Sequence, residues 1–563
     1  MRLTYLQPVD WAIVAIYFAA VLFIGFLLKR QTRTSDRFFF ADRDVTAWVA
    51  GLSFVAANMG ALELMGWAAS TYEYGLMTLH WYWIGSVPAI LFLAIIMMPF
   101  YYRSRAASVP GYLLQRFGQP SRVLSAVSFS LMTLLMSGIN MFAMAKVMQV
   151  MLGWNLHFSI WISALTVATY VVLGGLTSAI LNEVLQFFLI WMGVLVVPIL
   201  GLIECGGWHG LVERITANSA NASQYLHIWR TLGSPQSNPM GVDWIGIVFG
   251  LSMVAGFGYW TTDFLVVQRV MVAKNLRTAQ MAPVIGSFAK MAIPVIVVLP
   301  GLIGLALFSG GGGGIHLVPE SAAQAGQHTY NEVLPLLLIR YASPGLLGLG
   351  VTALIAGFMS GMAGNVSAFA TVWTYDIYEP LIARLKTPEH YLSVGRWSSF
   401  LGVLLSIGTA YFALHFTSIM DYVQALFSFF VSPLFATVLL GMFWKRATDA
   451  GAFWGLTSGM AVSIILWAAV RLTPAWLRYV TFSASAKPMA ETLYRMLWSW
   501  LVCAVVTVTI SLATQPRTEA ELVGLVYACT PKEKAQSVSW LHNPKFWAFI
   551  SLVVMVALQW LFW

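Results

Sequence analysis

The chain has 563 residues, of which 59% are hydrophobic and only 9% are charged. This balance excludes a soluble globular protein and leaves room for many membrane-spanning helices. The formal net charge of +9 would suit an anionic partner such as nucleic acid, but the basic residues are grouped in particular loops. The charge therefore reports membrane topology, and we expect no nucleic-acid partner.

Long apolar stretches predict an all-α integral membrane protein that spans the lipid bilayer many times. About fourteen transmembrane helices are expected, at residues 10–29, 46–70, 76–100, 121–152, 157–176, 180–203, 243–268, 279–310, 332–378, 391–416, 419–445, 449–472, 492–515 and 543–562. The stretch 332–378 is too long for one crossing, so we expect it to carry an extra segment outside the membrane.

Clusters of lysine and arginine follow the first, third, seventh and eleventh of these helices, which would all end on the same side. The residues are Lys29, Arg30, Arg33, Arg37, Arg43, Arg103, Arg105, Arg116, Arg269, Lys274, Arg277, Lys445 and Arg446. The positive-inside rule makes that side cytoplasmic. We therefore expect a multi-pass protein of the plasma membrane or a bacterial inner membrane, with both termini on the extracytoplasmic side.

Two of the expected helices carry a glycine-marked polar break, at 56–63 and at 255–260. Lipid offers backbone groups no hydrogen-bonding partners, so a spanning helix loosens only where it faces a buried cavity. A pair of such breaks in corresponding halves of a chain is typical of the midplane binding site of a secondary transporter. Transport of a small-molecule solute is therefore the predicted function.

The breaks also predict how the chain is organised. Residues 46–203 and 243–445 each contain five expected helices and each begin with an interrupted one. An odd number of helices makes the two blocks run through the membrane in opposite senses, as inverted repeats do. Residues 1–45 form an accessory first helix and a cytoplasmic loop, residues 204–242 an extracellular loop, and residues 446–563 accessory C-terminal helices.

Several motifs resemble the solute:sodium symporter family, in particular its branch of sodium/glucose cotransporters. They are Tyr259-Trp260-Thr261-Thr262-Asp263, Val267-Gln268-Arg269, Thr374-Tyr375-Asp376-Ile377-Tyr378, Asp421-Tyr422-Val423-Gln424 and Phe443-Trp444-Lys445-Arg446. The resemblance runs nearly end to end. It implies a LeuT-type core of 5+5 inverted repeats with broken first and sixth core helices, alternating access, and sodium as the co-transported ion rather than an enzymatic cofactor.

The resemblance also implies a sodium site between the first break and a later helix. Backbone carbonyls of Ala56 and Met59 and the positions Gly357 and Ser360 match the ligands of the family. Gly361 departs from the pattern because the family has a second serine there, so one hydroxyl ligand is missing. The alternative is that the small residues of this helix form a packing face, as glycines at such spacings often do in membranes.

Two ionisable residues fall inside the predicted solute site. Glu63 follows the first break, and an ionisable residue within a span is a functional candidate by default. Lys290, in the middle of the eighth expected helix, matches a sugar-site lysine of the family. We expect the two to form an ion pair that lowers the penalty of burying each charge. The alternative is a purely structural pair that sets helix packing.

Four further residues match the family's solute site: Gln424, which would hydrogen-bond a hydroxyl, the inner amide Asn58, and the aromatic lid Tyr259 and Trp260. An ordinary packed aromatic pair is the alternative for the lid. Tyr82 occupies the position where the family has a glutamate that binds sugar. We therefore expect a sugar or a similar polar organic solute and leave its identity open.

Four other polar residues remain to be interpreted. Glu183 matches an acidic position that influences cation coupling in the family, although a simple charge at a helix start is an equal alternative. Asp263 and Arg269 are expected to form a structural pair. His80 is expected to be a satisfied buried histidine rather than a titrating group.

Two other functions remain open beside sodium-coupled symport. One is proton-coupled or uncoupled solute transport by the same fold, with Glu63, Glu183 or His80 as the proton carrier. The other is a sensor that binds solute without transporting it. The sequence contains no catalytic triad, nucleotide-binding loop or metal-ligand spacing, so an enzyme is not expected.

Overall fold

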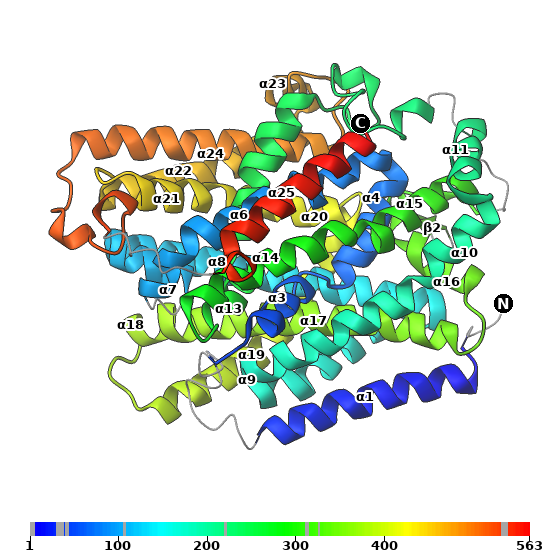
Figure 1. Cartoon of the computed structure of the whole chain (residues 1–563), viewed down its shortest axis with the longest axis horizontal. Helices are drawn as coiled ribbons and strands as arrows, with labels where there is room; N and C mark the ends of the chain where they lie inside the picture. Colours follow the sequence, from blue (N-terminus) through cyan, green and yellow to red (C-terminus); the bar gives the residue numbers. More distant parts are fainter. Residues whose placement is uncertain are drawn as a thin grey trace.

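The computed structural model describes residues 6–29, 39, 44–104, 108–218, 222–309, 315–324, 327–530 and 539–563. Within these residues the chain is almost entirely helical, and most helices run roughly along the long axis of the molecule (Figure 1). Ten helices in the described part are long and apolar enough to cross a membrane, and three shorter apolar helices accompany them. The predicted membrane fold is confirmed, whereas the count of fourteen spans stays a prediction.

The first half of the chain forms an uninterrupted helix, a broken helix, a bent helix and two long helical segments. These elements are α1 (Pro8–Lys29), α3 (Ala47–Ala56), π-helix η2 (Leu62–Gly66), α4 (Trp67–Tyr74), α5 (Leu79–Tyr82), α6 (Val87–Phe92), π-helix η4 (Leu93–Met97), α7 (Met98–Ser104), α8 (Val109–Leu152), α9 (Leu156–Val194), α10 (Val196–Cys205) and α11 (Gly207–Asn218).

The second half follows with a similar mixture of straight and interrupted helices. They are π-helix η7 (Gly246–Gly256), α12 (Phe257–Thr262), α13 (Phe264–Met271), α14 (Leu276–Ala292), α15 (Pro294–Phe308), α16 (Val333–Tyr341), α17 (Leu346–Val372), π-helix η10 (Trp373–Tyr378), α18 (Glu379–Leu381), α19 (Pro388–Ala410), α20 (Ile419–Leu426), π-helix η12 (Phe427–Val431), α21 (Ser432–Phe443), α22 (Asp449–Leu472), α23 (Leu477–Thr481), α24 (Pro488–Ala513) and α25 (Pro544–Leu561). Strands β1 (Leu317–Val318) and β2 (His328–Thr329) pair in parallel.

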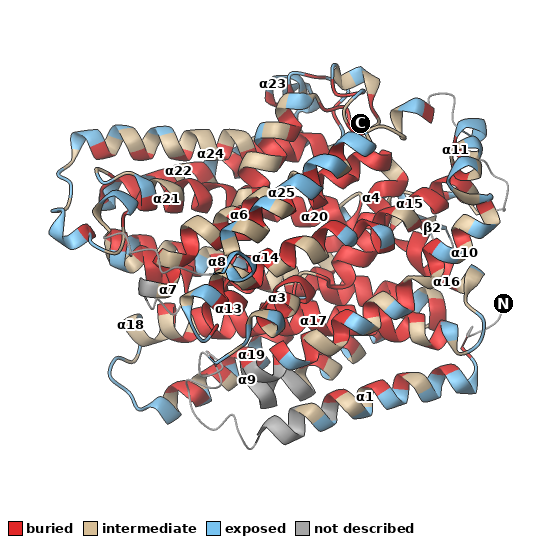
Figure 2. Cartoon of the chain, viewed as in Figure 1, coloured by how far each residue is buried: buried red, intermediate tan, exposed pale blue. Residues whose placement is uncertain are grey.

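Apolar side chains are distributed as expected for a protein in lipid. Buried residues fill the centre of the bundle, and exposed positions lie along outer helices such as α1, α24 and α25 (Figure 2). Exposed side chains on α24 and α25 include large apolar ones such as Val505, Val553 and Trp560. Such a surface would be unfavourable in water but is stable against acyl chains, so it agrees with the predicted contact with the bilayer.

The first predicted break is present. Helix α3 ends at Ala56, and regular helical structure resumes only at Leu62 with η2. The intervening residues, including Gly60, link α3 to η2 and α4 inside the protein, where neighbouring helices can satisfy their backbone groups.

The second break is real but lies later than predicted. The helical backbone continues through Gly256 into α12 and is interrupted at Asp263, whose backbone is extended and whose carboxylate accepts the amide hydrogen of Leu265. Gly256 has a packing role instead, because a Cβ there would lie 2.1 Å from the carbonyl oxygen of Gly85. Gly256 therefore marks a close approach of two backbones, not the point of unwinding.

The long stretch 332–378 contains a short helix followed by a long one, and the expected segment outside the membrane stays a prediction. The short helix α16 precedes α17, and Gly345 between them has φ +88°. The carboxylate of Asp10, from α1, accepts hydrogen bonds from the amides of Gly345 and Gly348, each at 2.7 Å. An acidic side chain of another helix thus caps the start of α17, where free N–H groups favour a negative charge.

The structure describes only some of the basic residues and span boundaries on which the expected topology depends. Arg116 is buried and donates to the carbonyls of Gly441 and Trp444, so it has a structural role as well as a charge. Arg30, Arg33, Arg37, Arg43 and Arg105 lie outside the described residues, as do the side chains of Lys29 and Arg103. Helices α9 and α10 cover two expected spans, and the side chains of 169–175 near the expected turn are also outside the described part. The domain boundaries and the orientation of the termini stay predictions.

Candidate transport site

The two breaks border a cavity in the middle of the bundle. Its volume is about 90 Å³. Residues of the first break, of α5, of η7 and α12, and of α8, α14, α17 and α20 line it. Among them are the expected residues Asn58, Glu63, Tyr82, Tyr259, Trp260, Lys290 and Gln424. The fold therefore brings together, around one cavity, all seven positions that the sequence predicts for the solute.

A chain of polar contacts crosses this cavity. The Lys290 ammonium lies 2.5 Å from the Glu63 carboxylate and donates to the side-chain oxygen of Asn58, also at 2.5 Å. The Asn58 amide in turn donates to the Tyr259 hydroxyl at 2.8 Å. Both charged side chains are at most 6% exposed. The predicted ion pair is present, and it links the first break to α14 and α12.

Aromatic rings surround the ammonium group of Lys290. It lies 4.7 Å from the centre of the Tyr82 ring and 5.3 Å from that of Trp260. Rings at this distance attract a cation through their negative faces, and the effect is strongest where water is excluded. Tyr82 thus stabilises the lysine without adding a second negative charge to the cavity. Tyr259 packs on Phe427 with 5.0 Å between ring centres.

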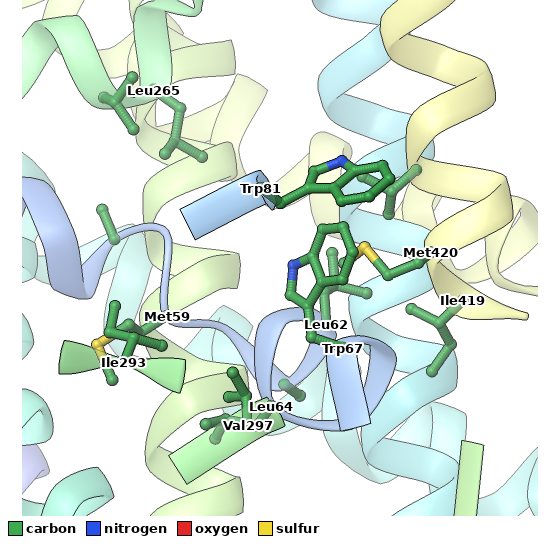
Figure 3. Close-up of a cluster of buried hydrophobic side chains, with 14 of the residues drawn as sticks. Met59, Leu62, Leu64, Trp67, Trp81, Leu265, Ile293, Val297, Ile419 and Met420 are labelled. Carbon is green, nitrogen blue, oxygen red and sulfur yellow. The ribbon is translucent and has the colours of Figure 1, made fainter. Parts of the chain in front are cut away.

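The rest of the cavity wall contains both apolar and polar side chains. Trp67 of α4 and Trp81 of α5 face each other, with 5.0 Å between ring centres, and Met420 of α20 lies beside them (Figure 3). The side-chain oxygen of Gln424, one turn after Met420 on α20, is buried and accepts no hydrogen bond from the described residues. A buried polar atom without a partner is unfavourable, so it is available to a ligand.

The four expected sodium ligands also meet. The hydroxyl of Ser360 on α17 donates to the carbonyl of Ala56, at the end of α3, over 2.9 Å. A Cβ on Gly357 would lie 3.2 Å from the carbonyl oxygen of Met59. Loosened helix ends that offer carbonyl oxygens beside a hydroxyl are suited to a hard cation such as sodium. The glycines of α17 are tightly packed as well, so the packing alternative describes the same contact.

Glu183 is buried on α9 and is not among the residues that line the cavity. Its carboxylate accepts hydrogen bonds from the Arg269 guanidinium, at 2.7 Å, and from the Ser53 hydroxyl. Both side chains of the Glu183–Arg269 ion pair are fully buried. The expected pair of Asp263 with Arg269 is therefore wrong. Asp263 caps α13 while Arg269, further along the same helix, reaches a partner on another helix.

His80 is a structural residue. Its ring nitrogen Nε2 lies 2.8 Å from the carbonyl oxygen of Ile228, and its ring packs against Trp229 at 4.7 Å. It is absent from the residues that line the cavity. The histidine is buried as predicted, but it is only half satisfied, because Nδ1 has no hydrogen-bond partner among the described residues.

Sequence reasoning missed several residues of the cavity. Trp67 and Trp81 appear in the sequence as two of many membrane aromatics, and nothing in their spacing distinguishes them. Asn140 on α8 and Asn365 on α17 were also missed, although an amide within an apolar span is a detectable signal, because lipid offers it no partner.

The sequence matches the sodium:solute symporter family over residues 38–459. The chain belongs to this family. Its members are transporters, in agreement with the expectation that the chain is not an enzyme, and the chain is accordingly a sodium-coupled solute symporter.

Several relatives are similar to this symporter over most of its length. Sodium/glucose cotransporter 4 of Homo sapiens is 29% identical, with 93% of this chain and 78% of the relative covered. The sodium/mannose cotransporter of Bos taurus is 31% identical, with 81% and 78% covered. The sodium/myo-inositol cotransporter of Homo sapiens is 28% identical, with 94% and 78% covered.

Among solved structures, a Na⁺-coupled sialic acid symporter in a substrate-bound outward-open state is similar. The TM-score is 0.72 at 21% identity, with 91% of this chain and 99% of the other covered. At this identity the likeness concerns the fold alone, and it agrees with the predicted LeuT-type architecture.

Proposed function

We propose that this symporter couples the inward movement of sodium to the uptake of a neutral sugar or polyol. The observation that carries this proposal is the charge balance of the cavity. Among the described residues that line it, Glu63 and Lys290 are the only ones with a formal charge, and each neutralises the other. A charged solute would need an unpaired partner, because burying an uncompensated charge is strongly unfavourable.

The chemistry of the lining suits hydroxyl groups. Each hydroxyl can donate one hydrogen bond and accept others, so it fits a wall that offers both donors and acceptors. Asn58, Glu63, Lys290 and Gln424 would bind the hydroxyls, while Tyr259 and Trp260 would cover the apolar face of the ring. The names of the relatives support this assignment, because glucose, mannose and myo-inositol are all neutral and hydroxyl-rich.

Sodium would bind beside this cavity, to oxygens of Ala56, Met59, Gly357 and Ser360. The ligands from α3 and α17 meet only when the two elements are close, so bound sodium would favour one arrangement of the helices. Glu183 would act on this equilibrium indirectly, by holding α9 to α13. We place the protein in the plasma membrane or a bacterial inner membrane, with both termini extracytoplasmic.

Uptake into proteoliposomes tests the coupling. We expect labelled glucose or myo-inositol to accumulate with an inward sodium gradient and to fall to the level of empty liposomes when choline replaces sodium. Two pH values separate sodium from proton coupling, because a proton-coupled carrier would retain its uptake in choline at low pH. Undiminished uptake in choline at both values would contradict sodium coupling, and solute binding without counterflow would indicate a sensor.

A second prediction concerns Gln424. Replacing it by alanine removes a hydrogen-bonding side chain from the cavity, and we expect solute affinity to fall by about five- to tenfold, or ~1 kcal/mol. Solute-induced thermal stabilisation of the purified protein measures this. The matched control is Gln186→Ala, because Gln186 is also a buried amide but bonds to Tyr17 outside the cavity. Equal solute affinity in both variants would remove Gln424 from the site.

A further inference from the structure

A side-chain oxygen from α8 lies where α17 lacks one. Gly361 has no side chain, yet a Cβ built on it would meet the Asn140 amide, at 3.1 Å from Oδ1 and 3.3 Å from Nδ2. A Cβ on Gly60, in the first break, would lie 3.1 Å from the same Oδ1. The amide of Asn140 thus occupies the space between the first break and α17, beside both glycines.

The hydrogen bonding of Asn140 leaves this oxygen free. The residue is 1% exposed, and its Nδ2 donates to the carbonyl of Met136 on its own helix at 3.3 Å. Its Oδ1 is buried and has no hydrogen-bond partner among the described residues. A buried acceptor without a partner is unfavourable, so this oxygen is available to a ligand.

The neighbourhood of this oxygen is that of the proposed cation site. Gly361 follows Ser360, whose hydroxyl contacts the carbonyl of Ala56, and Gly60 follows Met59. The oxygens offered by the first break and by α17 are therefore one residue away from the two glycines that enclose the amide. Amide oxygens are hard ligands of the kind that alkali and alkaline-earth cations prefer.

We propose that Oδ1 of Asn140 is a direct sodium ligand and supplies the side-chain oxygen that Gly361 does not. This proposal rests on the proposed function, because it assumes that sodium binds between α3 and α17. It adds α8 to the elements that hold the ion. It also explains why Asn140 occurs together with Gly361, because a serine at 361 and an asparagine at 140 would compete for the same space.

Sodium binding to the purified full-length protein tests the proposal without a transport assay. Thermal stabilisation is titrated with sodium chloride, with choline chloride holding the ionic strength constant. We expect Asn140→Ala to bind sodium roughly 10- to 100-fold more weakly than the unaltered chain. The matched control is Thr133→Ala, because Thr133 is buried on the same helix but its hydroxyl bonds to α8 itself. We expect that control to bind sodium normally.

A serine at position 361, which would supply the oxygen from α17 instead of α8, makes the test specific. We expect the double variant Asn140→Ala with Gly361→Ser to regain most of the sodium affinity, whereas Gly361→Ser alone weakens it by crowding the amide. A double variant as weak as Asn140→Ala would overturn the claim that both oxygens serve one ligand position. Should Asn140→Ala fail to fold, Asn140→Asp keeps the shape and an oxygen, and a large loss of sodium affinity in it would also overturn the proposal.

A second titration separates the ion from the solute, because Asn140 also borders the cavity. At saturating sodium, we expect Asn140→Ala to lose far less affinity for glucose and myo-inositol than it loses for sodium. Weakened sugar binding with normal sodium binding would assign Asn140 to the solute and contradict this inference. No stabilisation of the unaltered chain by sodium would instead contradict the proposed function, so the two failures are distinguishable.

Discussion

Replacing Lys290 by methionine is expected to destabilise the protein and to abolish solute uptake. The change leaves the Glu63 carboxylate buried, at 5% exposure, without its cationic partner. Removing one member of a buried ion pair lowers stability by about 3–5 kcal/mol, which is a large part of the stability of most domains. A lowered melting temperature in detergent, together with lost uptake in proteoliposomes, would show both effects.

The partner variant separates stability from transport. We expect Glu63→Gln combined with Lys290→Met to recover most of the melting temperature, because no uncompensated charge remains. Uptake should stay absent, because two groups proposed to bind the solute hydroxyls are lost. Lys445→Met is the control, since Lys445 pairs with Glu519 at the exposed surface and such pairs contribute little. Normal uptake by the double variant would mean that the pair is structural only.

Replacing Arg269 by methionine is expected to have an effect of similar size. Its guanidinium is fully buried and binds the Glu183 carboxylate and the carbonyl of Leu265, each at 2.7 Å. The change strands a buried carboxylate, so we expect stability to fall by about 3–5 kcal/mol. Arg269→Lys should rescue it only partly, because an ammonium group cannot reproduce two divergent contacts. Melting temperatures of the three proteins give the comparison.

The same pair tests whether Glu183 takes part in coupling. The double variant Glu183→Gln with Arg269→Met removes both charges, so we expect it to be folded. If Glu183 influences sodium coupling, solute uptake by the double variant will require a higher sodium concentration than uptake by the unaltered protein. An unchanged sodium dependence would leave the pair a role in packing alone.

The general fold could be predicted from the sequence because every segment that crosses lipid must be apolar and must satisfy its backbone hydrogen bonds within its own helix. Apolar length predicts the helices, and the break before Glu63 was found because polar and glycine residues interrupt an apolar run there. The same pattern misplaced the second break. Glycine allows a helix to unwind and also allows two backbones to touch, and Gly256 has the second role, against Gly85. Only the position of the neighbouring helix distinguishes the two.

The site could be predicted in part for a related reason. Ionisable residues are so unfavourable in a membrane that Glu63 and Lys290 were conspicuous, and with two of them a pair was the simplest solution. Arg269 had several acidic candidates, and proximity in sequence favoured Asp263 over the correct partner, Glu183. Asn140 was missed because its significance depends on Gly361, which lies on a different helix and contributes only empty space.

The neutral pair at the cavity has a consequence for how a membrane voltage acts on the protein. Because Glu63 and Lys290 cancel each other, the empty cavity carries no net charge from its lining. With a sodium ion and a neutral sugar bound, it carries one positive charge. An inside-negative potential therefore drives the inward movement of the loaded form, by about 2.3 kcal/mol per 100 mV for a charge that crosses the whole field. The return of the empty form moves no charge of this lining, so the voltage does not oppose it through these residues.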